Sequence, residues 1–299
     1  MQWIVTFLLL CSMNLICSVS FAKEPRATSA DNSAKALRAK YTELTQELKN
    51  NQFKRPLYLI SEESPNNLKG EIYAVVNHPF AKVNTALNNP AHWCDVLILH
   101  INIKYCQASI NKTDTILNVN LGKKYDQPLE DTSQVKFKYR EMATSPNYFA
   151  IQLNAKEGPF GTSNYQILIE ATPIKEGKTF LHFTYTYSFG ISGRIAMKGY
   201  LATIGRDKVG FTANDNPADG QPSYIQGVRG VVERNTMRYY LAIDAYLAAL
   251  TSPPDSQPEK RLQLWYSGTE AYPRQLREVE REDYITMKRK EYKRQQAGL

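Results

Sequence analysis

Apolar residues recur at every second position along much of residues 99–190. Six segments of this kind alternate apolar with polar side chains, and turn-forming residues separate them at 111–114, 145–147, 157–159 and 175–178. A period of two indicates half-buried strands, and short connections require neighbouring strands to be antiparallel. The pattern predicts an antiparallel sheet with one covered apolar face and one polar face in water. His100 and His182 lie at polar positions of this pattern, so both are expected to point to water.

Helical spacing replaces the alternation after the sheet. An apolar stripe predicts a long helix over residues 224–250, followed by a Pro-containing linker and a polar helix over 273–296. The stripe consists of Val228, Val232, Tyr239, Ile243, Tyr246 and Leu250. Shorter helices are predicted over 34–50, 80–87 and 191–204, and a short strand over 71–76 precedes the other six. Residues 53–60 contain Pro56 and are predicted to be extended at best.

The first 22 residues resemble a secretory signal peptide. Their apolar centre spans residues 3–10, and Ser20 and Ala22 are small residues at the two positions that a signal peptidase reads. We therefore expect cleavage near Ala22 and a periplasmic or secreted protein. The alternative is an uncleaved anchor, because no Lys or Arg precedes the apolar run.

Two cysteines, Cys94 and Cys106, lie outside this leader. In an oxidising compartment such a pair is typical of a disulfide, which we predict. A metal pair or a reactive thiol is less consistent with the sequence, because there is no CxxC spacing and no nearby His/Cys cluster. We expect no metal site and no cofactor.

Some local sequences are similar to a known superfamily. Ala74-Val75-Val76 leads into Pro79-Phe80 and Val83, and Asn89-Pro90 is followed by Trp93. With the order of elements, they resemble the START-like superfamily of lipid-transfer domains and polyketide cyclases. The resemblance implies an α+β helix-grip fold, in which a seven-stranded antiparallel sheet wraps around a long C-terminal helix, here with extra N- and C-terminal helices.

This reading divides the chain into four regions. They are a signal peptide (1–22), a leader with an N-terminal helix (23–67, its first part disordered), a START-like domain (68–250), and a linker with a basic C-terminal helix (251–299).

The apolar face of the sheet and the long helix must cover each other. Incomplete packing between them leaves a cavity suited to an apolar, lipid-like ligand, and binding or carrying such a ligand is the predicted function. For each side chain the competing interpretation is a solid core. The candidate lining residues are Tyr105, Phe137, Tyr139, Phe149, Tyr165, Phe183, Tyr185, Tyr187, Tyr239, Ile243 and Tyr246.

Two alternatives remain open at this stage. The first is a cyclase or hydratase of the same fold, for which Arg140 and Glu170 are the side chains to check, although no catalytic motif is present and a non-enzyme is favoured. The second is a structural protein that uses the basic C-terminal helix to bind a partner or an anionic membrane surface, through Tyr284, Met287 and Tyr292 together with Lys288, Lys290, Lys293 and Arg294. The net charge of +8 favours anionic partners. An exported protein rarely meets nucleic acid, so that partner is not expected.

Overall fold

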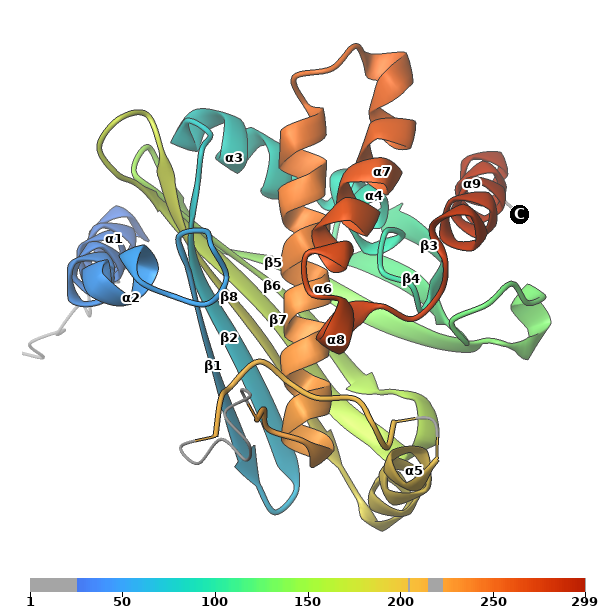
Figure 1. Ribbon diagram of the computed structural model, residues 1–299. Coiled ribbons are helices and arrows are strands. Elements are labelled where there is room, and N and C mark those ends of the chain that lie inside the picture. Colours follow the sequence, from blue (N-terminus) through green and yellow to red (C-terminus); the bar gives the residue numbers. More distant parts are fainter. Residues whose placement is uncertain (1–25, 204, 215–222, 299) are drawn as a thin grey trace, which may run out of the picture.

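The computed structural model describes residues 26–203, 205–214 and 223–298. Its strands form one antiparallel sheet in the order β1-β2-β8-β7-β6-β5-β4-β3 (Figure 1). The strands are β1 (Leu57–Ser64), β2 (Asn67–Val76), β3 (Ile103–Ile110), β4 (Thr115–Leu121), β5 (Ser133–Ser145), β6 (Tyr148–Glu157), β7 (Thr162–Pro173) and β8 (Thr179–Phe189). The predicted signal segment lies outside the described residues.

The long helix α6 (Gly227–Ala249) crosses one face of this sheet, here called the inner face (Figure 1). The arrangement is the helix-grip fold that the START-like resemblance implied. The sheet has eight strands rather than seven, because β1 pairs with β2 from Leu57↔Ala74 to Ser64↔Asn67. Pro56 does not prevent this pairing, since it precedes the first residue of an edge strand.

The helix approaches the sheet most closely at a glycine. A Cβ atom built on Gly70 of β2 would lie 2.1 Å from Oγ1 of Thr236 in α6. Only a residue without a side chain fits there, so Gly70 allows α6 to pack directly against β2 and β8.

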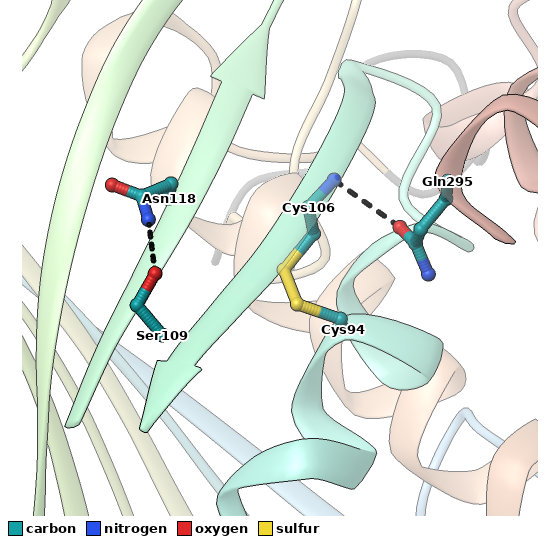
Figure 2. The surroundings of a disulfide bond; sticks show 5 residues. All are labelled: Cys94, Cys106, Ser109, Asn118 and Gln295. Carbon is teal, nitrogen blue, oxygen red and sulfur yellow. Dashed lines mark hydrogen bonds between the residues drawn. A yellow bond between two sulfur atoms is a disulfide. The ribbon is translucent and has the colours of Figure 1, made fainter. Parts of the chain in front are cut away.

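Two short helices, α3 (Phe80–Leu87) and α4 (Trp93–Leu97), connect β2 to β3. The predicted disulfide is present and joins Cys94 of α4 to Cys106 of β3 (Figure 2). The backbone N–H of Cys106 also donates a hydrogen bond to Oε1 of Gln295, 3.2 Å away in the C-terminal helix. The chain before β3 is therefore fixed both covalently and by the C-terminal segment. Three-residue 3-10 helices are Pro90–His92, Leu129–Asp131, Pro159–Gly161 and Pro254–Ser256.

The outer face of the sheet is partly covered, contrary to the expectation that it faces water. Helix α1 (Arg26–Glu43), followed by α2 (Thr45–Lys49), packs against β5, β6 and β7. Ala30, Ala34 and Leu37 are buried in one cluster with outer-face residues such as Tyr148 and Phe180. The prediction that the first part of the leader, residues 23–33, is disordered is wrong for residues 26–33, since the helix begins at Arg26.

The C-terminal segment is part of the fold. The predicted linker contains a helix, α7 (Gln257–Glu270), which packs along α6, and it is followed by α8 (Pro273–Leu276) and α9 (Arg281–Ala297). Helix α9 packs on β3 and α7. Tyr284, Met287 and Lys288 are buried and not available to a membrane or a partner, whereas Lys290 and Lys293 are exposed and Tyr292 and Arg294 are half-buried.

A buried charge group fastens α9 to β3. Glu291 lies 3.0 Å from Nζ of Lys104 and 2.8 Å from Nζ of Lys288, and all three side chains are fully buried. Nζ of Lys288 also donates to the carbonyl oxygens of His100 and Ile103 at 2.8 and 2.7 Å. The C-terminal helix thereby holds the segment that contains His100.

One further helix, α5 (Ile191–Ala202), lies between β8 and α6 in the sequence, close to the predicted position. It lies at one extremity of the molecule (Figure 1). Within the described residues, no helix combines the length and the apolar character needed to span a bilayer.

Candidate functional site

A cluster of tyrosines lies between the sheet and α6. Alternate residues of β8 face the helix, which places Tyr185 and Tyr187 on the inner face beside Tyr165 of β7. The rings of Tyr165 and Tyr187 are nearly parallel, with centroids 5.3 Å apart. The ring centroid of Tyr185 lies 5.2 Å from that of Tyr239 in α6. Phe137 meets the ring of Tyr165 edge-on at 6.3 Å. The rings form one continuous aromatic surface under α6.

A histidine that the sequence analysis placed in water belongs to this cluster. The ring of His100 stacks on Tyr239 with centroids 4.5 Å apart, and the residue is only 3% exposed. The expectation for His100 is wrong because the residue is not on a strand. The polypeptide turns between α4 and β3, and this turn points the imidazole inward.

The imidazole of His100 has one unused nitrogen. Nδ1 lies 3.2 Å from the backbone N–H of Asn102 and accepts its hydrogen bond, so the ring proton is on Nε2. Nε2 is buried and has no hydrogen-bond partner in the described part of the chain. Burial, and then the positive charge of Arg238 and Lys288, hold the pKa of His100 well below its usual value. The ring is therefore neutral and presents one free donor.

Three tyrosine hydroxyls in the cluster are also unused. The hydroxyl of Tyr165 donates to Oγ1 of Thr162 at 2.8 Å. No hydrogen bond among the described residues involves the hydroxyl of Tyr185, Tyr187 or Tyr239, although these side chains are 3–8% exposed. Buried tyrosine hydroxyls usually have a partner. Burial raises the pKa of all three, so they stay protonated and can donate.

Positive charge is in excess next to the cluster. Arg238 immediately precedes the stacked Tyr239 in the sequence and is buried. Its Nη2 lies 2.6 Å from Oε1 of Glu278. The same carboxylate pairs with Lys124 at 2.8 Å and Lys208 at 3.6 Å. Nε of Arg238 is buried without a partner. Three cations therefore share one carboxylate, which favours an electron-rich group nearby.

The structure brings together six of the predicted lining residues: Phe137, Tyr165, Phe183, Tyr185, Tyr187 and Tyr239. The other five lie elsewhere. Phe149 packs against Phe80 of α3, Ile243 is buried in the core, and the hydroxyl of Tyr139 donates to Asn88. Cys106, the next residue on β3, points to the inner face, and successive side chains of a strand point to opposite faces. Tyr105 therefore lies on the opposite face of the sheet.

Tyr246, the remaining predicted residue, lines a separate apolar groove of about 420 Å³ between α3 and the end of α6. Its other lining residues are Leu247, Leu250, Ala81 and Ala86, together with His78, Lys82, Thr85, His92 and Thr251. This groove is open to the surface, and most of its exposed lining is apolar.

The structure brings neither side chain proposed for catalysis to the cluster. Arg140 is exposed on β5, and Glu170 lies on the outer face, where it contacts His182. His182 is thus the second histidine whose predicted exposure is wrong, since α1 and the neighbouring strands bury it. Within the described residues, no group of three His, Cys, Asp or Glu side chains is placed to hold a metal ion.

No family model and no curated protein matches this sequence. Several solved structures are similar in part. A conserved protein from Geobacillus kaustophilus has a TM-score of 0.34 and 13% identity, covering 61% of this chain and 95% of that one. Human StAR-related lipid transfer protein 5 has a TM-score of 0.30 and 9% identity, covering 58% and 90%. Norcoclaurine synthase from Thalictrum flavum has a TM-score of 0.30 and 13% identity, covering 50% and 77%.

Proposed function

We propose that this protein binds an amphipathic small molecule between the sheet and α6. The apolar part of the ligand packs on the tyrosine rings, and its hydrogen-bond-accepting or anionic group meets His100 and Arg238. One observation carries the proposal: in a single aromatic cluster, the buried Nε2 of His100 has no hydrogen-bond partner among the described residues, and no hydrogen bond within them involves the hydroxyl of Tyr185, Tyr187 or Tyr239.

The energetics of unused donors supports a ligand rather than a solid core. A buried donor without a partner costs about 1–3 kcal/mol, and Nε2 of His100 is such a donor. Phenylalanine fills an apolar core without any unused hydroxyl, as Phe137 and Phe183 do in the same cluster. A ligand that supplies acceptors recovers the lost hydrogen bonds, and the neutral His100 and the protonated tyrosines donate to it without any change of charge.

We further propose that the protein acts outside the cytoplasm, in the periplasm or as a secreted protein. The signal-like composition of residues 1–22 and the bond between Cys94 and Cys106 support this location. Cell fractionation and N-terminal sequencing of the mature chain test it. A chain that starts at Met1 in the cytoplasmic fraction contradicts it.

Native mass spectrometry of the protein purified without detergent, with analysis of its organic extract, tests ligand binding. We expect a discrete bound mass. In Tyr185→Phe and Tyr239→Phe the ring stays and one donor is lost, so affinity for the extracted compound should fall about five- to tenfold. Tyr105→Phe is the matched control, because Tyr105 is as buried as Tyr239 but lies on the other face of the sheet.

Two results would overturn the proposal. One is a protein that carries no ligand and shows no thermal shift with fatty acids, phospholipids or aromatic acids. The other is a bound compound whose affinity is the same in Tyr185→Phe, Tyr239→Phe and Tyr105→Phe.

A further inference from the structure

Large apolar side chains are exposed together at one extremity of the molecule. Phe160, Ile191 and Ile195 are 78%, 81% and 66% exposed. Only three other large apolar side chains in the described residues are exposed, and those lie on other elements. Phe160 is at the turn between β6 and β7, and the other two are on α5. Water contact with so much apolar surface in one place is typical of an interaction site.

The turn and the helix are joined, so the three side chains belong to one surface. The backbone N–H of Gly190 donates to the carbonyl of Gly161 at 3.2 Å. A Cβ atom on Gly193 would lie 3.3 Å from the carbonyl oxygen of Phe160. The first turn of α5 therefore rests directly on the residues around Phe160.

Helix α5 has a distinct inward side. Gly193 is buried, and Met197, Tyr200 and Leu201 are half-buried. These positions follow the i, i+4, i+7, i+8 spacing of one helix face. The inward side attaches α5 to the body of the protein and leaves the opposite side to solvent.

The outward side combines apolar and basic residues. Ile191, Arg194, Ile195 and Lys198 follow the spacing i, i+3, i+4, i+7 and share one stripe. Residues 191–202 contain no Asp or Glu. Arg194 holds the helix to the β1–β2 turn through Asn66 Oδ1 at 2.8 Å, while Lys198 is exposed and has no ion-pair partner among the described residues.

We propose that α5 and the β6–β7 turn form a docking surface for an anionic lipid bilayer, with Phe160, Ile191 and Ile195 inserted among the acyl chains and Arg194 and Lys198 against the phosphates. The charge complementarity of this stripe selects an anionic surface. Its position at an extremity suits a flat membrane. Docking here does not depend on the ligand proposed above and is tested separately.

Co-sedimentation of the whole protein with vesicles tests the proposal. The wild-type protein should bind equimolar phosphatidylglycerol–phosphatidylcholine vesicles and bind phosphatidylcholine vesicles much more weakly. The triple variant Phe160→Ser/Ile191→Ser/Ile195→Ser should lose at least about tenfold in partition coefficient. Lys198→Glu should lose roughly tenfold on the anionic vesicles alone. Ile110→Ser and Lys112→Glu, exposed residues at the end of β3 and in the turn after it, are the matched controls and should bind like wild type.

A second measurement does not rely on loss of binding. Ile191→Trp places an indole on the stripe, and its emission should shift to the blue when anionic vesicles are added. Absence of the shift, or equal binding by the wild type and the triple variant, overturns the proposal. So does a dimer in sedimentation equilibrium that the triple variant abolishes, because the surface then serves a second copy of the chain.

Discussion

Nε2 of His182 lies 2.9 Å from Oε1 of Glu71 on the outer face of the sheet, under α1. Its other ring nitrogen, Nδ1, lies 2.8 Å from Oε1 of Glu170. The ring of Tyr73 stacks on the imidazole with centroids 4.1 Å apart. Burial opposes a charged imidazole, but the hydrogen bonds to Glu170 and Glu71 outweigh it and raise the pKa of His182. Hydrogen bonds from His182 and Lys69 lower the pKa of Glu71 to about 2 against the cost of burial.

This arrangement predicts a specific pH dependence of stability. The stabilisation from a charged His182 is fully present below the imidazole's ordinary pKa of 6.5 and is lost as the pH rises through its raised value. The stabilisation from Glu71 is present above 4.5 and is lost as the pH falls toward 2. His182→Gln should therefore lower the free energy of unfolding more at about pH 5.5 than at about pH 9. Urea denaturation of both proteins measures it, and an equal loss at both pH values would contradict it.

Glu291 is predicted to be the most sensitive charged residue of the C-terminal helix. In Glu291→Gln two buried ammonium groups, those of Lys104 and Lys288, lose the carboxylate that both of them contact. Breaking a buried ion pair from one side costs about 3–5 kcal/mol. Chemical denaturation should show a loss of this size, whereas the exposed control Glu157→Gln should change little. A loss below about 1 kcal/mol would mean that the lysines find another neutralising partner.

Gly70 should tolerate no side chain. Gly70→Ala places a methyl group against Thr236 and must displace that side chain or α6, at a cost of about 1–3 kcal/mol. The matched control is Gly199→Ala in α5, where nothing lies within 4 Å of the added atom and helix propensity improves by about 1 kcal/mol. Thermal melts compare the two. If Gly70→Ala melts like wild type, the close contact of α6 with β2 is not present in solution.

The strands and the long helix could be predicted from the sequence because each has a one-sided pattern. Alternation identified β4–β8 but only the first residues of β3, because the predicted strand began at Leu99 and β3 begins at Ile103; the stripe from Val228 to Leu250 identified α6. The inner-face aromatics followed from the same alternation, which is why Tyr185 and Tyr187 were correctly placed opposite α6. Strand β1 was missed because its alternation is short and follows a proline.

The errors came from contacts between distant segments. A polar residue in the alternating pattern shows only on which face of the sheet its side chain lies, not whether that face is exposed. His182 lies on the face that α1 covers. His100 could not be placed, because its orientation depends on the turn that the disulfide and Lys288 hold. No local pattern in the sequence encodes those contacts. The unused Nε2 of His100, on which the proposed function depends, could be found only in three dimensions.

The disulfide gives a prediction that links stability to this site. Cys94→Ala/Cys106→Ala should lower the free energy of unfolding by roughly 2–3 kcal/mol, since the bond closes a short loop. The same loop contains His100, so ligand affinity should fall as well. Denaturation and ligand titration of the double variant, compared with the reduced wild-type protein, measure both effects. A double variant with wild-type stability would show that α9 alone holds this segment.

The unused hydroxyl of Tyr185 predicts an unusual response to mutation. In the ligand-free protein Tyr185→Phe removes a donor that has no partner, so the free energy of unfolding should stay the same or rise by up to about 1 kcal/mol. Tyr284→Phe is the matched comparison, because the hydroxyl of that fully buried tyrosine donates to the carbonyl of Leu99 at 2.8 Å. Its loss should cost about 1–2 kcal/mol. Delipidated protein and urea denaturation provide the measurement. If Tyr185→Phe is destabilised as much as Tyr284→Phe, the hydroxyl of Tyr185 already has a partner in the folded protein, and the case for a ligand at this cluster is lost.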